Sequence, residues 1–320
     1  MTQTTEMTVD QAQVSLSAVS RWLTRVMAAA YLVLGLVMFA FPAWSAHHFP
    51  WRVSSFVAIT LGSYLLGNAW IAAVAQHTWT FASAYSSLLY LWLFGVLETA
   101  VVLIHHDKLI TGAVLTIPYL IVLGLTVLAA VLGLAEWARR RPPLRSGGIA
   151  MPGLVRGLQI AFVVVVGFIA AVVFYGPASA HDARYFPVPL TSFTLGALGV
   201  FYLSLSLSVL AMVTQPGTAT LATYLRGTIV LLVVIVIATL LYLGTFHFGA
   251  HPRRIVYLGT YVVVLVGTVA IMAWHRNRDL AASVELMTRR GRPARACTAR
   301  RTGLPTRRAG PGPLTSPVPT

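Results

Sequence analysis

Eight long apolar segments dominate the sequence and restrict the folds that the chain can adopt. Each is about 20 residues or longer, the length that a helix needs to cross the hydrocarbon core of a bilayer. Hydrophobic residues make up 57% of the chain and charged residues only 10%, far fewer charges than a soluble surface needs. The sequence therefore predicts an all-α integral membrane protein with helices over residues 22–41, 54–76, 82–104, 110–134, 154–175, 191–214, 222–245 and 254–274.

The positive charges predict the orientation of these helices. Loops that stay in the cytoplasm are rich in Lys and Arg. With eight spans, one side of the membrane receives most of the arginines, including Arg21, Arg139–Arg141 and Arg276. The first twenty residues hold acids but no Lys or Arg, so we do not expect a secretory signal there. Both termini are expected in the cytoplasm. The near-exclusive use of Arg over Lys is typical of a bacterium with a GC-rich genome. Together with the eight spans, it predicts a multi-pass protein of the inner (cytoplasmic) membrane.

Two loops nearly repeat each other. Residues 42–47 read PAWSAH and residues 177–182 read PASAHD, and each is followed by a Phe-Pro pair. The offset of 137 positions, from Phe49 to Phe186, also aligns Leu61-Gly62 with Leu198-Gly199. Each half contains four spans, and an even number gives both copies the same orientation. The sequence therefore predicts two tandem parallel four-helix repeats, related by an axis along the membrane normal.

The repeat divides the chain into expected segments. A polar N-terminal segment and a basic linker flank the first repeat, and a short amphipathic helix follows the second. The last segment is rich in Arg, Pro and Gly, so we expect it to be disordered. Its charge would attract anionic lipid headgroups, through Arg289, Arg290, Arg292 and Arg295 among others. The segments are 1–20, 21–138 (first repeat), 139–153 (linker), 154–275 (second repeat), 276–290 (amphipathic helix) and 291–320 (tail).

Glu98 is the one acid that this division places clearly inside a span. It lies roughly 9 Å from the outer end of the third span at 1.5 Å per residue. A carboxyl group within a bilayer is costly, so a functional role is the first hypothesis. His105 follows seven residues later on the same helix face, which suggests a proton or cation path. The alternative is that Glu98 simply forms a hydrogen bond with a neighbouring hydroxyl group.

Three further residues are candidates for a transport site. Pro118 falls midway through the predicted fourth span, where it would free the carbonyl of Val114; such broken helices occur in transporters, although a packing kink is the commoner explanation. Asn68 and Tyr64 lie within the second span. They either line a small cavity or join helices to one another.

Most of the histidines are expected on the outer side. Imidazole and carboxylate groups are ligands of zinc and copper, so a metal or pH-sensing site is one hypothesis. The spacing does not require it, because adjacent His pairs do not point in the same direction on a helix. The alternative is that imidazole is simply tolerated at the headgroup boundary, as are the aromatic residues Trp44, Phe49 and Trp51. The metal candidates are His47, His48, His105, His106, Asp107, His181, Asp182, His247 and His251.

Three classes of function remain open. We favour a transporter of a small molecule or ion, on account of the duplicated spans, Glu98 and Pro118. A non-catalytic membrane subunit, assembly factor or scaffold is the first alternative, and its partner would be another membrane protein or a second copy of the chain. The second is an outward-facing sensor that uses the histidines. Phosphate-binding loops and zinc or nucleophile motifs are missing from the sequence. These absences argue against an enzyme but leave catalysis by the histidines at the outer face open as an alternative. We expect no cofactor, and the lipid bilayer accounts for the basic charge without nucleic acid.

Overall fold

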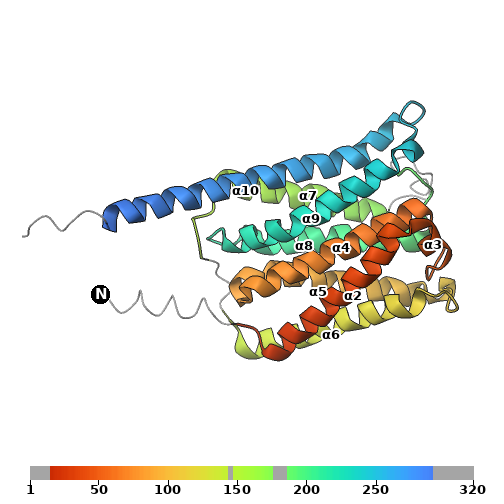
Figure 1. The fold of residues 1–320 in the computed structure, drawn as a ribbon, viewed down its shortest axis with the longest axis horizontal. Coiled ribbons are helices and arrows are strands. Elements are labelled where there is room, and N and C mark those ends of the chain that lie inside the picture. The colour runs from red at the N-terminus through yellow and green to blue at the C-terminus, as the bar shows by residue number, and fades with distance from the viewer. Residues whose placement is uncertain (1–14, 143–146, 176–185, 291–320) are drawn as a thin grey trace, which may run out of the picture. The chain divides into compact units, whose positions relative to one another are not determined.

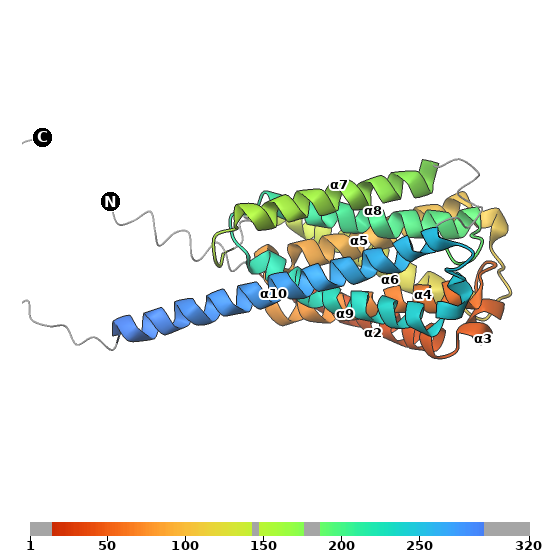
Figure 2. The ribbon, with the colours of Figure 1, turned by 90° about the horizontal axis from the view of Figure 1, so that it is seen from above.

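The computed structural model describes residues 15–142, 147–175 and 186–290, with side chains as far as residue 278. The chain divides into two compact units, Met1–Arg276 and Asn277–Thr320. Throughout the described residues the regular structure is helical. Figure 1 shows the long helices running side by side in the first unit, and Figure 2 shows them after a quarter turn.

Eight of the described helices are long and apolar enough to cross a membrane, which confirms the predicted number of spans. A short helix, α3 (Pro42–His47), follows the first of them, and the single turns η1 (His106–Lys108), η3 (Leu243–Phe246) and η4 (Pro252–Arg254) occupy later loops. The eight are α2 (Ala18–Ala40), α4 (Ser55–Thr78), α5 (Phe81–Ile104), α6 (Thr116–Arg140), α7 (Gly153–Tyr175), α8 (Ser192–Val213), α9 (Ala219–Leu241) and α10 (Ile255–Arg290).

Hydroxyl side chains start several of these helices. A Ser or Thr side chain at the N-cap accepts a hydrogen bond from a backbone N–H group that the helix itself cannot satisfy. Ser17 caps α2, Ser54 caps α4 and Thr191 caps α8 in this way. Ser54 and Thr191 are 137 positions apart, the same offset that aligns the two Phe-Pro pairs.

Burial separates inner helices from outer ones. About three quarters of the apolar stretch is buried in α4 (78%) and α8 (72%), against 17% in both α7 and α10. The close contacts join α2 with α4 and α7 with α8, and across the two halves α4 with α9 and α5 with α8. Consequently α4 and α8 lie inside the bundle, whereas α7 and α10 run along its outside (Figures 1 and 2).

Two glycines allow equivalent helices to approach each other closely. A Cβ atom at Gly62 of α4 would lie only 2.8 Å from the backbone nitrogen of Phe39 in α2. A Cβ atom at Gly199 of α8 would lie 2.9 Å from the ring of Phe174 in α7. At Gly62 the obstacle includes backbone, so a larger residue would push α2 and α4 apart. At Gly199 a larger residue would have to displace the ring of Phe174.

One of the aromatic pairs between the two halves consists of residues at equivalent positions. Tyr64 of α4 and Phe201 of α8 stack with a centroid distance of 3.9 Å and an interplanar angle of 4°. These residues are again 137 positions apart in the sequence. Both side chains are almost fully buried, so this stack lies in the middle of the hydrophobic core.

Backbone bridges close one end of the bundle. Ser15, just before α2, pairs with Thr80 in the turn between α4 and α5. Ala150, just before α7, pairs with Gly217 in the turn between α8 and α9. We call this the bridge end; the opposite end carries α3, η1, η3 and η4 and is called the α3 end.

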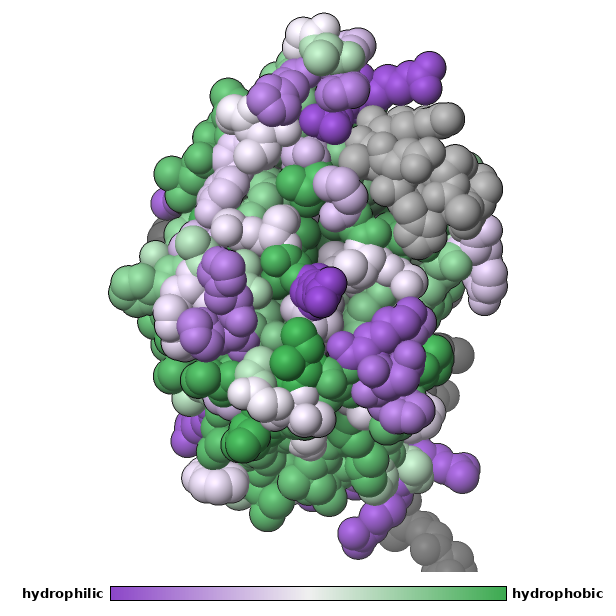
Figure 3. All heavy atoms as spheres, turned by 90° about the vertical axis from the view of Figure 1, so that its right-hand side faces the viewer, coloured by the Kyte–Doolittle hydropathy of each residue, from purple (hydrophilic) through white to green (hydrophobic). Residues whose placement is uncertain are grey.

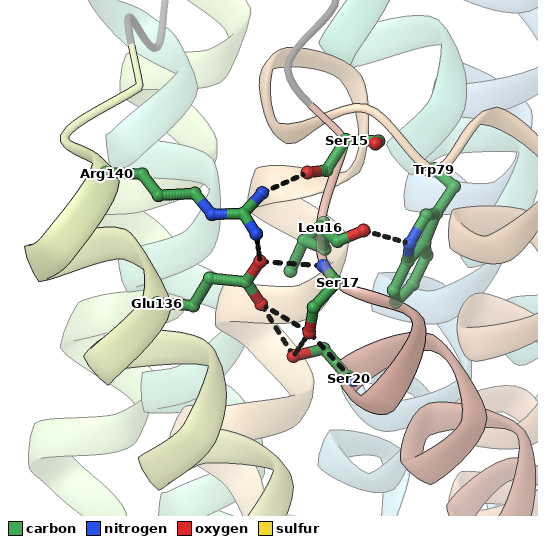
Figure 4. Close-up of polar contacts among 7 residues, drawn as sticks. All are labelled: Ser15, Leu16, Ser17, Ser20, Trp79, Glu136 and Arg140. Atoms are coloured by element: carbon green, nitrogen blue, oxygen red, sulfur yellow. Dashed lines mark hydrogen bonds and ion pairs between the residues drawn. The ribbon is translucent and has the colours of Figure 1, made fainter.

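Glu136 anchors the start of α2 at the bridge end, a role that was not predicted from the sequence. The fourth span was predicted to end at residue 134, but α6 extends to Arg140 and so includes a second acid. Glu136 accepts hydrogen bonds from the Ser17 backbone N–H at 2.6 Å and the Ser20 hydroxyl at 2.8 Å, and pairs with Arg140 at 3.2 Å (Figure 4). The side chain of Glu136 is only 10% exposed.

The last helix is longer than predicted. Residues 276–290, expected to form a separate helix, continue α10 without a break. The division of the chain into two compact units falls within this helix, between Arg276 and Asn277. Arg289 and Arg290 belong to its final turn, whereas Arg292 and Arg295 lie outside the described residues. Lipid binding by these arginines stays a prediction.

Candidate functional site

Glu98 lies deep inside the bundle, on the buried face of α5. It is 2% exposed. The hydroxyl group of Tyr119, on α6, donates a hydrogen bond to its Oε1 atom at 2.6 Å. Its other oxygen, Oε2, is buried and forms no hydrogen bond with any described residue. A buried carboxyl oxygen without a partner costs free energy, so the site calls for a water molecule or a proton there.

A small cavity adjoins this carboxyl group. Its volume is about 10 Å³, roughly the space that one water molecule occupies. Its walls come from both halves of the chain: Met38, Phe49, Leu61, Tyr64, Leu65, Phe94, Tyr119 and Ala197. Apart from Glu98 itself, the two tyrosines are the only wall residues with a polar side chain. The cavity is thus too small for an organic substrate, but large enough for water next to Glu98.

Aromatic residues of the first loop cover the site. Phe49 and Trp51 pack against the ring of Tyr119, with centroid distances of 5.6 and 5.3 Å. Trp51 also stacks on Phe193 at 3.8 Å. Phe49 and Trp51 are only 1% and 2% exposed, so the expectation that they sit in an outer aromatic belt was wrong. The loop folds inward because burying these rings removes more apolar surface than the headgroup region would cover.

His105 is the C-cap residue of α5, seven positions beyond Glu98. Its ring packs near Phe193 at a centroid distance of 5.7 Å. The buried side chains of α5 between the two are Val101 and Val102, each 6% exposed. Both are apolar, so α5 itself supplies no relay group between His105 and Glu98. The predicted path between the two stays a prediction.

The other transport candidates are distributed over the core. The Oδ1 atom of Asn68 accepts a hydrogen bond from Tyr90 at 2.8 Å, so this residue joins α4 to α5. Tyr64 lines the Glu98 cavity, and its hydroxyl group contacts that of Tyr261 at 3.2 Å. The predicted place of Pro118 within its helix was wrong. Because α6 begins at Thr116, Pro118 lies in the first turn rather than midway through the span. A first-turn proline removes no helical hydrogen bond, because that N–H has no partner within the helix.

The histidines do not form a metal site among the described residues, where no three His, Cys, Asp or Glu side chains come together. Nδ1 of His48 contacts the carbonyl of Trp44, and Nδ1 of His106 that of Leu103. Figure 3 looks onto the α3 end and shows hydrophilic residues in separate patches among hydrophobic ones. His181 and Asp182 lie outside the described residues. Metal binding by His47, His105, Asp107, His247 and His251 accordingly gains no support from geometry.

A larger cleft opens between α7 and α10. Its volume is about 420 Å³, and its lining is almost entirely apolar. At its base lie Tyr202 and Tyr261, whose hydroxyl groups are hydrogen bonded to each other at 2.9 Å. The hydroxyl of Tyr261 also contacts that of Tyr64, so the base of the cleft reaches the residue that lines the Glu98 cavity.

Sequence reasoning singled out Glu98 but missed the groups that complete the site. Tyr119, Tyr202 and Tyr261 read as ordinary aromatic residues of apolar spans, and only their convergence gives them a role. Phe49 and Trp51 carried a signal, since they belong to the repeated loop. In comparisons with known proteins, no family model, curated protein or solved structure matches this chain.

Proposed function

We propose that this polytopic membrane protein is a proton-linked transporter and that Glu98 is its proton-binding group. The observation that carries the proposal is the unpartnered Oε2 atom of a 2% exposed carboxyl group next to a water-sized cavity. Hard divalent cations require about six or more oxygen ligands. The site offers one carboxylate and one nearby hydroxyl, so a proton fits it better than a metal ion.

Protonation would change the interactions of Glu98. The ionised carboxylate accepts a hydrogen bond from Tyr119, which offsets only part of its desolvation cost. A protonated carboxyl group can donate a hydrogen bond from Oε2 to water in the cavity. Because it is neutral, it also avoids most of the desolvation cost of the carboxylate. The two protonation states therefore favour different surroundings. A transporter uses such a difference to couple a conformational change to proton binding.

The proposal includes the two tandem parallel repeats. Several independent pairs of features support them at the same offset: the N-caps Ser54 and Thr191, the close approaches at Gly62 and Gly199, and the stacked Tyr64 and Phe201. The backbone bridges before the first helix of each half add a further pair. Parallel repeats occur in transporters that rock one half against the other around a central site.

The decisive test is Glu98→Gln, which keeps the size of the side chain but removes its ionisation. Purified protein would be reconstituted into vesicles that contain a pH-sensitive dye, and proton entry would be driven by a potassium diffusion potential. We expect a higher proton flux in vesicles with wild-type protein than in protein-free vesicles. Glu98→Gln should lower this flux by at least about tenfold, equivalent to about 1.4 kcal/mol in the barrier. Glu136→Gln, which changes an acid at the bridge end, is the matched control and should retain the flux.

Two results would contradict this function. One is equal proton flux in the wild type and Glu98→Gln; the other is no flux above protein-free vesicles from folded wild-type protein. Folding of each variant would be checked by its elution as a single species in detergent. Tyr119→Phe removes the hydrogen bond but keeps the carboxyl group, so we expect it to lower the flux by less than Glu98→Gln.

A membrane subunit or scaffold is the second candidate, and the outer helices favour it. The exposed sides of α7 and α10 present large apolar residues outside the cleft, including Leu154 (77% exposed), Val164 (63%) and Val263 (70%). Such a surface suits lipid and a partner helix equally well. If the chain is a subunit, Glu98→Gln should have no effect on proton flux. Bulky substitutions along α7 should then separate a complex that is isolated from native membranes.

A further inference from the structure

The cleft between α7 and α10 corresponds to the Glu98 cavity of the first half. In the first half, Phe49 packs against Tyr119 at a centroid distance of 5.6 Å. In the second half, Phe186 packs against Tyr257 at 5.9 Å. Phe186 follows Phe49 by 137 positions and Tyr257 follows Tyr119 by 138. Phe49 and Tyr119 line the Glu98 cavity, and Phe186 and Tyr257 line the cleft.

In the first half, the helices that correspond to α7 and α10 are packed together, and no cleft separates them. Tyr31 of α2 and Thr126 of α6 are fully buried and hydrogen bonded at 2.9 Å, and α2 packs along α6. The corresponding residues are Phe168 of α7, at an offset of 137, and Val264 of α10, at the offset of 138 that relates Tyr119 to Tyr257. Phe168 is 68% exposed and Val264 is partly buried, and neither side chain can form a hydrogen bond. The helices α7 and α10 do not pack along each other. The cleft of about 420 Å³ therefore takes the place of a helix–helix contact.

The base of the cleft is polar although its walls are not. Tyr202 and Tyr261 are 8% and 5% exposed, and their hydroxyl groups form a chain with that of Tyr64. Three hydroxyl groups carry three protons, and the two bonds within this chain use only two of them. The lining residues include no charged side chain. A guest in the cleft would thus meet apolar walls, a hydroxyl base and no charge.

From this arrangement we propose that the cleft binds a neutral, membrane-dissolved small molecule, with its apolar chain between α7 and α10 and a hydroxyl or carbonyl oxygen at Tyr202 and Tyr261. The inference rests on the proposed function and names its substrate class. Tyr64 connects the two sites, because its hydroxyl group belongs to the tyrosine chain and the residue also lines the Glu98 cavity. A bound oxygen that alters this chain would alter the surroundings of Glu98.

The size of the cleft favours a small molecule over a partner helix. Ligand sites for small molecules have volumes of about 300–1,000 Å³, and this cleft lies within that range. A spanning helix is about 10–12 Å wide with a pitch of 5.4 Å. The cleft would accept roughly one turn of such a helix. It also opens between the outermost helices of the bundle, where molecules dissolved in the hydrocarbon have direct access.

Photolabelling with a fatty alcohol that carries a diazirine on its chain tests this proposal. The full-length protein in lipid nanodiscs would be irradiated, and labelled peptides identified by mass spectrometry. A hydrocarbon of the same chain length, with the diazirine but without the hydroxyl group, serves as the reference. We expect saturable labelling by the alcohol at Ile169, Val173 and Val256, and weaker, non-saturable labelling by the hydrocarbon.

Two substitutions distinguish the cleft from the general lipid surface. Val172→Trp fills the cleft and should reduce alcohol labelling by at least about tenfold. Val164→Trp, about 80° around the same helix from Val172, is the control and should leave it unchanged; Val164 is 63% exposed and does not line the cleft. Tyr261→Phe should weaken alcohol binding by about threefold to tenfold while hydrocarbon labelling stays the same.

Failure of this proposal can be told apart from failure of the proposed function. Equal labelling by alcohol and hydrocarbon, or labelling that Val172→Trp leaves unchanged, would overturn the cleft as a specific site. Glu98→Gln should keep saturable labelling at the cleft, because Glu98 does not line it; the coupling through Tyr64 should change only the concentration of alcohol needed for saturation. Saturable labelling combined with unchanged proton flux in Glu98→Gln would support the binding site and contradict the transport function.

Discussion

Single glycines determine how closely the central helices approach each other. At Gly67 of α4, a Cβ atom would lie 2.8 Å from the Cα atom of Leu231 in α9. Because the obstacle includes backbone, a rotamer change of Leu231 cannot relieve the overlap. The contact joins α4 of the first half to α9 of the second, so this glycine controls packing between the halves.

We expect Gly67→Ala to destabilise the protein by about 1–3 kcal/mol through overpacking. The matched control is Gly124→Ala in α6, where a Cβ atom would meet nothing within 4 Å. This control should be neutral or stabilising, since Ala favours helix by about 1 kcal/mol over Gly. Unfolding in mixed micelles of increasing denaturing detergent would measure both variants. Equal stability of the two would refute the close approach of α4 and α9.

At the scale of elements, the start of α2 depends on the end of α6. The N-terminal N–H groups of a helix need partners from outside the helix. Glu136 supplies its carboxylate to the Ser17 N–H and to the Ser20 hydroxyl, and Arg140 donates a hydrogen bond to the Ser15 carbonyl at 2.9 Å (Figure 4). A carboxylate at a helix N-terminus is also favoured by the helix dipole. The residues before α2 are thereby fastened to a helix more than 100 positions away in sequence.

Replacement of this carboxylate should loosen only one end of the bundle. We expect Glu136→Ala to accelerate amide hydrogen exchange in the first turn of α2 by about tenfold, as the loss of a charge-assisted hydrogen bond implies. Exchange in the middle of α2 should not change. Arg139→Ala provides the control, because none of the hydrogen bonds at this anchor involves Arg139. If amide exchange in the first turn of α2 is no faster in Glu136→Ala than in this control, the anchor contributes little to the stability of that turn.

The outer helices show how equivalent elements can differ in role. In the first half, α6 packs on α2 and α5, whereas in the second half α10 places Tyr257, Tyr261 and Thr268 in the core but packs extensively along no other helix. Hydrogen bonds among the tyrosine hydroxyls and partly buried apolar residues such as Leu265 and Met272 hold α10 against the core. An interface without extensive helix packing is easier to open than a closely packed one. The cleft could therefore widen without disruption of α4 and α8.

For the whole molecule, the proposed orientation places the bridge end in the cytoplasm. The arginines of the described helices support it, because Arg21, Arg140 and Arg156 all contact backbone at that end. Positively charged residues remain on the cytoplasmic side during insertion. The α3 end would then face outward, with His106 in its loop.

The single cysteine of the chain, Cys297, allows a direct test of this orientation. In intact cells we expect a membrane-impermeant maleimide not to label the native protein, and to label it after lysis. In a Cys297→Ser background, His106→Cys should react in intact cells, whereas Arg141→Cys should react only after lysis. Labelling of Cys297 and His106→Cys from the same side would contradict the odd number of spans that separates them, from α6 to α10.

The sequence by itself determined the class of the protein and the number of its spans. Both follow from local properties: a run of about 20 apolar residues must form a helix in a bilayer, because every backbone group needs a partner. Span ends were less certain, since residues near the boundary suit either side of it. For this reason the predicted fourth span began and ended too early. In the structure Glu136 belongs to α6, and Pro118 lies in the first turn of that helix.

Only the tertiary structure decided what surrounds each polar group. The sequence marked Glu98 as unusual, but its partner Tyr119 and the covering rings of Phe49 and Trp51 come from other parts of the chain. Nothing local distinguishes Tyr202 and Tyr261 from other tyrosines in apolar helices. Their hydroxyl groups meet because the fold brings α8 and α10 within reach of each other at these two side chains. Packing between distant segments is a property that no local pattern encodes.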